Sequence, residues 1–289
     1  MIRTLLLAVA SAGLAPASHV ANAQALPDTV DLVTAIPVVR FERAVAMDND
    51  KSETVYVADS ATDQIVRLDL STGSVERWAG PGGGLQQFDA PSDIDATNGL
   101  RIIVADEGNG RLVWLSADGV FVSAVSLGPT PGNFDSVVRR PVSIAAIGDA
   151  VVFIDAARSE LLQWTPAQGV RRIAGGAGSP VFLVDPTAVT IDEDNIFVAD
   201  EGSRSVLVFD RLGSLERQLC RQECAEIRNV GIVGTETVAV VLESEVRLYN
   251  RDGRLHHRIY VHSSGLVDAS IQSSSILFLT RNGLYRIRY

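Results

Sequence analysis

Four aspartates recur along the chain at similar intervals, and each follows a short apolar run. The run reads VADEG twice, and VADS and FIDA are two related copies. The aspartates are Asp59, Asp106, Asp155 and Asp200, with spacings of 47, 49 and 45 residues. Carboxylates brought together by folding would suit a hard cation such as calcium, which takes oxygen ligands. The matching positions later in the chain are Glu243 and Thr280, so a ring of acids is incomplete. We therefore predict that each aspartate is structural and accepts backbone N–H bonds in the turn that it begins.

Arginine offers a second chemistry, because it supplies nearly all of the positive charge of the chain. Arg43, Arg140 and Arg228 lie at or next to the start of three apolar segments. Ser92 and Thr187 occupy comparable places in two others. The planar guanidinium group binds a carboxylate or a phosphate through two parallel hydrogen bonds. If the segments converge, these residues form an anion-binding site; the alternative is that the arginines form salt bridges with acids on the same loops.

Other common catalytic patterns are absent from the sequence. Histidines around a metal should be spread over several segments, but three of the four histidines lie within residues 256–262, where we expect surface positions. The sequence holds no Gly-x-Ser-x-Gly nucleophile motif, and GPGGGL at residues 80–85 lacks the Lys-Ser/Thr pair that completes a phosphate-binding loop. We therefore predict no catalytic residue, no metal and no cofactor.

The regular spacing of the four aspartates also predicts the secondary structure around them. A period of about 45 residues indicates a repeat architecture. One unit, SDIDATNGLRIIVADEGNGRLVWLSADGVFVSAV, contains four short apolar pieces separated by Gly, Asn and Asp turns. It reads as a four-stranded antiparallel meander. A turn glycine keeps the same rhythm in five units; these glycines are Gly73, Gly119, Gly169, Gly213 and Gly253.

Six such units fit the chain, and they predict a closed ring. Their first strands are AVAMD, SDIDA, VSIAA, TAVTI, NVGIV and DASIQ. The sixth unit ends at Tyr289 without a fourth strand, whereas DTVDLVTAI, residues 28–36, is a spare strand before the first unit. Pairing the two would remove the open edges of the ring. We predict an all-β, six-bladed propeller closed by this N-terminal strand, with the three tryptophans packed between blades; an open solenoid would leave the spare strand unexplained.

Two stretches carry a family resemblance: FDAPSDIDATNGLRIIVADEGNGRLVWLSADGVF and VDPTAVTIDEDNIFVADEGSRSVLVFDRLGSL resemble NHL repeats. The resemblance extends over residues 38–289 and implies a six-bladed β-propeller whose ligands bind at the mouth of the central channel. In similar lactonases and gluconolactonase-like hydrolases, Glu, Asn and Asp side chains hold a metal there. The ring expected at the mouth of this chain, Arg43, Ser92, Val142, Thr187, Arg228 and Val267, contains none of these residue types.

The N-terminal residues 1–25 read as a secretory signal peptide, with Arg3 before an apolar run and small-residue cleavage sites near Ala23 or Ala25. Export to the periplasm or beyond the cell favours a disulfide between Cys220 and Cys224. The mature protein is then a single propeller domain, residues 26–289, with no later membrane-spanning run. A net charge of −10 argues against nucleic acid as a partner.

We therefore expect an exported, monomeric, non-catalytic binding module that recognises a protein or a small anionic ligand on its channel-mouth face. The alternative is a propeller hydrolase or lyase that uses the central channel. An enzyme requires convergent acid, base or metal-binding groups in the channel, whereas a binding module requires only a rigid, shaped surface.

Overall fold

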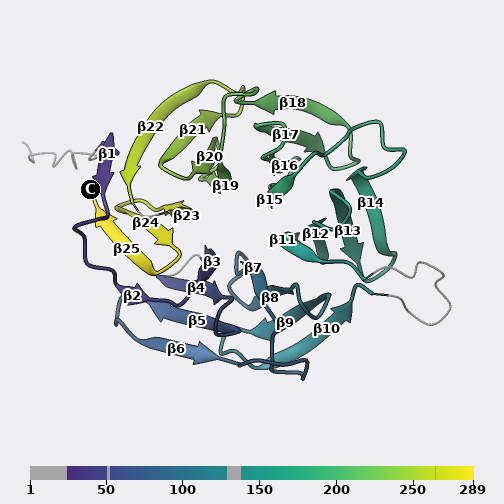
Figure 1. Cartoon of the computed structure of the whole chain (residues 1–289), viewed down its shortest axis with the longest axis horizontal. Helices are drawn as coiled ribbons and strands as arrows, with labels where there is room; N and C mark the ends of the chain where they lie inside the picture. The colour runs from purple at the N-terminus through teal and green to yellow at the C-terminus, as the bar shows by residue number, and fades with distance from the viewer. Residues whose placement is uncertain (1–24, 51–52, 129–137, 264) are drawn as a thin grey trace, which may run out of the picture.

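Six sheets, each built on four antiparallel strands, surround a central axis in sequence order (Figure 1). This computed structural model describes residues 25–50, 53–128, 138–263 and 265–289. The expected signal peptide lies outside these residues except for Ala25. Within the described ranges all regular structure is strand, and no helix is present that could cross a membrane. The chain therefore forms the six-bladed β-propeller that its repeat predicts.

Blades one to three contain β3 to β14, and within each blade the first strand lies closest to the axis. Blade one is β3 (Ala44–Asn49), β4 (Thr54–Asp59), β5 (Gln64–Asp69) and β6 (Val75–Trp78). Blade two is β7 (Pro91–Asp95), β8 (Arg101–Asp106), β9 (Arg111–Ser116) and β10 (Phe121–Ser126). Blade three is β11 (Pro141–Ile147), β12 (Ala150–Asp155), β13 (Glu160–Thr165) and β14 (Gly169–Gly175).

Blades four to six contain the remaining strands, including the two N-terminal ones. Blade four is β15 (Pro186–Ile191), β16 (Asn195–Asp200), β17 (Ser205–Asp210) and β18 (Leu215–Leu219). Blade five is β19 (Ile227–Val233), β20 (Thr237–Leu242), β21 (Glu245–Asn250) and β22 (Leu255–His262), with β1 (Thr29–Asp31) added outside β22. Blade six is β23 (Leu266–Ile271), β24 (Ser275–Thr280), β25 (Gly283–Arg288) and β2 (Val39–Arg40).

An N-terminal strand closes the ring as predicted, but it is not the expected segment. The closing strand is β2, whose Val39 is opposite Leu284 of β25 in an antiparallel pair. The expected segment, residues 28–36, instead contributes β1, which pairs in parallel with β22 of blade five. Val30 and Leu32 are buried there among side chains of blades five and six. The alternating pattern of the expected segment did indicate a strand, but its apolar face packs one blade away from the closure.

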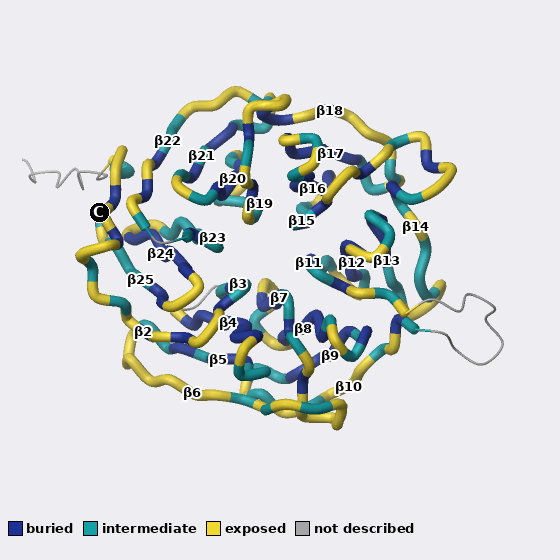
Figure 2. Tube along the Cα trace, viewed as in Figure 1, coloured by how far each residue is buried: buried dark blue, intermediate teal, exposed yellow. Residues whose placement is uncertain are grey.

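Burial explains why the second strand of each blade is so apolar. This strand is covered on both faces by the neighbouring blades, and β4, β16 and β24 are buried along their whole length. The outermost strands β6 and β10 are largely exposed (Figure 2). A strand covered on both faces reads as a continuous apolar run rather than as an alternating one.

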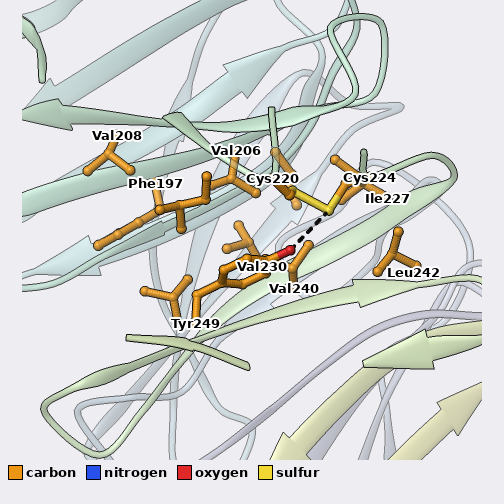
Figure 3. Packing of buried hydrophobic residues seen from close by; sticks show 14 residues of the cluster. Phe197, Val206, Val208, Cys220, Cys224, Ile227, Val230, Val240, Leu242 and Tyr249 are labelled. Carbon is orange, nitrogen blue, oxygen red and sulfur yellow. Dashed lines mark hydrogen bonds between the residues drawn. A yellow bond between two sulfur atoms is a disulfide. The ribbon is translucent and has the colours of Figure 1, made fainter. Parts of the chain in front are cut away.

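Six hydrophobic clusters among the described residues join neighbouring blades in pairs around the ring. The cluster between blades four and five contains the predicted disulfide, which is confirmed between Cys220 and Cys224 (Figure 3). Tyr249 lies beside it, with its hydroxyl oxygen 3.8 Å from the sulfur of Cys224. A disulfide is consistent with an oxidising compartment. Trp114 and Trp164 pack in the cluster between blades two and three, and Trp78 in that between blades one and two, as the sequence predicts.

The repeated aspartates accept backbone N–H bonds, but mostly from a different loop than expected. Asp59 accepts from Glu42 and Arg43 at 3.1 and 2.9 Å, in the loop that enters the first strand of the same blade. Asp200 accepts from Val184 and Asp185 at 3.0 and 2.8 Å. Asp106 and Asp155 bond the entry loops of their own blades in the same way; from its own turn, Asp155 also accepts the backbone N–H of Ala157, and Asp106 accepts the side-chain N–H of Asn109. Each carboxylate therefore holds the loop that leads into the channel.

Blade five lacks this aspartate and replaces it with an acid from its neighbour. By strand register the equivalent residue is Leu242, one position before the expected Glu243, and Leu242 has no acceptor. Glu201 of blade four instead accepts the backbone N–H groups of Glu226 and Ile227 at 2.9 and 2.6 Å. The entry loop of blade five is therefore held by a carboxylate as well, although that carboxylate comes from another blade.

Removing one of these carboxylates should cost stability. Replacing Asp200 with alanine leaves the N–H groups of Val184 and Asp185 without their acceptor, and we expect a loss of about 2–4 kcal/mol in the free energy of unfolding. Urea denaturation measures the loss. Asp194→Ala is the matched control, because the Asp194 side chain is exposed; it should change stability by less than about 0.5 kcal/mol. Equal losses in the two variants would contradict the structural role of Asp200.

Candidate functional site at the channel mouth

A cavity of about 590 Å³ opens at the end of the central channel where the entry loops converge. We call it the mouth cavity. It lies between blades one, two, five and six, and its polar lining residues include Arg43, Ser92, Glu107, Arg228, Glu243 and Arg281. Ligand sites are usually concave regions of this size with a few convergent polar groups. The mouth cavity is therefore the candidate site on the face that the sequence analysis selected.

Strand register corrects one position of the predicted ring. In all six first strands the pairing shifts by one residue near the start, at Val45, Ser92, Val142, Thr187, Arg228 and Val267. Blade one therefore places Val45 in the ring, and Arg43 lies two residues earlier, on the entry loop. Arg43 still lines the mouth cavity, because Asp59 fixes that loop through the backbone of Arg43.

The three arginines of the mouth cavity differ in how their charges are compensated. Arg228 is paired with Glu243, Nη2 to Oε2 at 2.8 Å. Arg43 donates from Nε to the hydroxyl of Ser60 at 2.9 Å, and among the described residues it has no carboxylate partner. Arg281 is exposed, and its guanidinium group likewise has no ion pair within the described part of the chain. Two positive charges at the mouth are thus left without a carboxylate.

The other predicted ligand-binding residues are engaged elsewhere or lie away from the cavity. Arg140 forms an ion pair with Glu107, and its own side chain does not line the cavity. Ser92 lines the cavity, but its hydroxyl donates to the carbonyl of Pro141 at 2.7 Å. Thr187 lies on blade four, outside the cavity, with its hydroxyl 3.5 Å from the carbonyl of Ala199. The structure thus brings Arg43, Ser92 and Arg228 together and adds Arg281, which the sequence analysis had not singled out.

The channel below the mouth contains four carboxylates that sequence reasoning missed, two of them on buried residues and two on half-buried ones. They belong to Asp48, Asp93, Asp95 and Asp268. Each accepts a backbone N–H from the first strand of the next blade or from the residue directly after it: from Ala96, Ile144, Ala146 and Met47, at 2.7, 2.7, 2.7 and 3.3 Å. The inner edge of a first strand has no neighbouring strand, so its N–H groups need such acceptors. These carboxylates therefore bond blade to blade around the channel.

Burial controls the ionisation of these four groups. Desolvation raises the pKa of Asp93 to about 7 and the pKa of Asp268 to about 7, against the stabilising effect of the hydrogen bonds that each accepts. Desolvation also raises the pKa of Asp48 and Asp95, and the charge of Asp95 raises the pKa of Asp48 further. Carboxyl groups with such values exchange protons near neutral pH.

These acids correct one expectation. The predicted ring contained no Asp or Asn, but the residues immediately after Ser92, Arg228 and Val267 are Asp93, Asn229 and Asp268. The sequence did contain an indication of these acids: in SDIDA, two aspartates alternate with apolar residues in a strand next to the channel. No group of three acidic, His or Cys side chains within the described ranges has the arrangement of a metal site. The described histidines lie on β22, the fourth strand of blade five.

Comparisons with known proteins identify the fold but no family. No protein-family model and no curated protein matches the chain. Among solved structures, a streptogramin B lyase is similar at 13% identity with a TM-score of 0.59, over 87% of this chain and 84% of that one. A catalytically inactive virginiamycin B lyase from Staphylococcus aureus with quinupristin is similar at 9% identity with a TM-score of 0.61, over 87% and 96%. A computationally designed protein is similar at 13% identity with a TM-score of 0.52, over 85% and 70%. Identities this low show a shared propeller fold, and the NHL resemblance stays a prediction.

The raised pKa values predict how stability depends on pH. Because Asp268 binds its proton more tightly in the folded chain, its contribution to the free energy of unfolding is fully present below about pH 4 and is lost as the pH rises through about 7. Relative to Asp268→Asn, the unaltered protein should lose stability between about pH 4 and 7, by up to about 1.4 kcal/mol per pH unit.

Urea denaturation at several pH values in this range measures the effect. Asp69→Asn is the control, because hydrogen bonds from Ser71 and Thr72 lower the pKa of this exposed carboxyl to about 2, outside the range tested. Parallel stability curves for the unaltered protein and Asp268→Asn would contradict the raised pKa.

Proposed function

We propose that the mouth cavity binds an anionic group, a carboxylate or a phosphate, carried by a small ligand or by an acidic peptide segment. The observation that supports this is the pair of guanidinium groups of Arg43 and Arg281, which line the cavity without carboxylate partners among the described residues. An exposed positive charge in a concave site is available for an incoming anion, whereas a paired one is not. On this proposal the protein is a binding module that makes and breaks no covalent bond.

The surrounding charges favour the same assignment. The chain as a whole carries a net charge of −10, so a local excess of positive charge departs from its average surface. Within the cavity, Glu243 is neutralised by Arg228, and Glu107 is neutralised by Arg140 from outside it. The remaining charges are positive, and a cleft lined by one sign of charge concentrates ligands of the other sign.

Arg43 is also held in place before any ligand arrives. Its Nε donates to the hydroxyl of Ser60 at 2.9 Å, and its Nη2 lies 3.4 Å from the carbonyl oxygen of Ser60. The backbone of Arg43 is fixed in turn by Asp59. A guanidinium group oriented in this way loses less conformational entropy when it binds an anion. The terminal Nη1 forms none of these bonds and is the atom that we assign to the ligand.

A lyase or hydrolase reaction in the channel is the second candidate. The buried carboxyl groups of Asp93 and Asp268, each with a pKa of about 7, are suited to transfer protons at neutral pH. Three of the similar solved structures are lyases by name. We rank this candidate second because Asp93 and Asp268 already accept backbone N–H bonds from their own strand and from the next blade. Accepting these backbone N–H bonds is reason enough for aspartates at these two positions, without a catalytic role.

Calorimetric titration with inorganic phosphate, succinate and a short polyglutamate peptide tests the proposal. We expect at least one of these probes to bind, and the double variant Arg43→Ala/Arg281→Ala to weaken it by roughly tenfold or more, since each arginine supplies a charge-assisted hydrogen bond. The melting temperature should stay nearly unchanged, because neither guanidinium group is paired with an acid in the described part of the chain.

The matched control is Arg254→Ala/Arg288→Ala, which removes the same charge from exposed sites away from the mouth cavity. If both double variants weaken binding equally, the attraction is a general charge effect and the mouth assignment is wrong. Absence of binding for all three probes at millimolar concentration would also overturn it.

A further inference from the structure

A second cavity, of about 640 Å³, lies at the opposite end of the propeller from the mouth cavity. It runs between blades two and three, from the channel toward the rim, and is bordered by the hairpin turns that connect first to second strands. We call it the inter-blade groove and define it by Asp95, Arg101, Trp114, Val122, Asp149 and Trp164. The groove lies outside the anion site proposed at the mouth cavity.

Two indole rings form the floor of this groove. Trp114 comes from β9 of blade two and Trp164 from β13 of blade three, and their ring centroids are 5.1 Å apart with the planes tilted by 52°. Trp114 is buried, whereas Trp164 is half-buried. Val122 is 54% exposed at the outer wall. The groove thus combines a wide apolar surface with the electron-rich faces of aromatic rings, which attract cations.

The inner end of the groove is acidic. Asp95 lines both the groove and the channel, and it is 8% exposed. It accepts hydrogen bonds from the backbone N–H groups of Thr97 and Ala146, which are neutral donors. The other channel carboxylates, those of Asp48, Asp93 and Asp268, also receive their hydrogen bonds from neutral donors within the described part of the chain.

The single basic residue of the groove does not offset this charge. Arg101 is paired with Asp149, Nη2 to Oδ1 at 3.7 Å, and both side chains are well exposed. That pair is neutral as a unit and lies at the turns that connect first to second strands in blades two and three. No other basic side chain lines the groove among the described residues. The groove therefore joins an aromatic floor to a carboxylate end that has no counter-charge.

We propose that the inter-blade groove binds an amphipathic organic cation: a protonated or quaternary amine on an apolar or aromatic body. The amine lies at the inner end, near Asp95, and the body packs on Trp164 and Val122. A neutral apolar molecule would gain the same contact area but would leave the carboxylates uncompensated, and an anion would be repelled by them. This site is independent of the mouth cavity, which lies at the other end of the channel and carries the opposite charge.

The probe that separates charge from shape is benzyltrimethylammonium, compared with its neutral isostere neopentylbenzene. We expect the cation to bind the unaltered protein at least tenfold more tightly, as followed by tryptophan fluorescence and by the indole N–H signals in NMR spectra. Trp164→Leu should weaken binding of the cation by about tenfold. Trp78→Leu, in the cluster between blades one and two, is the matched control and should leave binding unchanged.

Asp95→Asn tests the role of the charge, and it should reduce the preference for the cation over the isostere to about twofold. Because Asp95 is buried, circular dichroism must first show that the variant folds; if it does not, the comparison of the two probes on the unaltered protein decides alone. Equal affinity for the cation and the isostere overturns the proposal. So does the absence of cation binding, or a Trp164→Leu variant that binds the cation as tightly as the unaltered protein.

Discussion

A buried carboxylate that accepts backbone N–H groups is the interaction on which this propeller depends. It is used in two ways. At the end of the second strand, as in Asp59 and Asp200, it holds the loop that enters the same blade. In the first strand, as in Asp93, it accepts an N–H from the next blade across the channel edge. A propeller leaves the inner edge of every first strand without a partner strand, so the backbone groups there must be satisfied by side chains.

The same interaction gives the two ends of the channel different chemistry. At the mouth, the carboxylates are turned into their own loops, which hold Arg43 in position and leave guanidinium groups facing outward. Deeper in the channel, burial raises the pKa of Asp48 and Asp95, and the charge of Asp95 raises the pKa of Asp48 further. The same interaction therefore leaves a positive rim at one end of the channel and carboxyl groups of raised pKa toward the other.

Where a blade lacks the aspartate that holds its entry loop, neighbouring residues replace its function. Blade five has Leu242 in place of the aspartate, and Glu201 from blade four accepts the N–H groups of the entry loop. The disulfide between Cys220 and Cys224 lies in the segment that leads from blade four into that loop. A covalent link over so short a segment restricts the local chain, which suits a loop whose acceptor comes from a neighbouring blade. Two independent restraints thus act on the most divergent part of the ring.

The sequence by itself determined the number of blades, the strands within each and the disulfide, because these depend on spacing, turn residues and local apolar pattern. It also predicted that an N-terminal strand closes the ring. Only the tertiary structure decided that this strand is Val39–Arg40 and that residues 28–36 pair with blade five, since such pairing depends on which apolar face finds a partner. The position of Arg43, the unpaired charge of Arg281 and the buried acids of the channel were likewise decided by tertiary structure. These features arise where segments far apart in sequence come together. The sequence pattern of a strand indicates which residues share a face, but not which residues of other blades they contact.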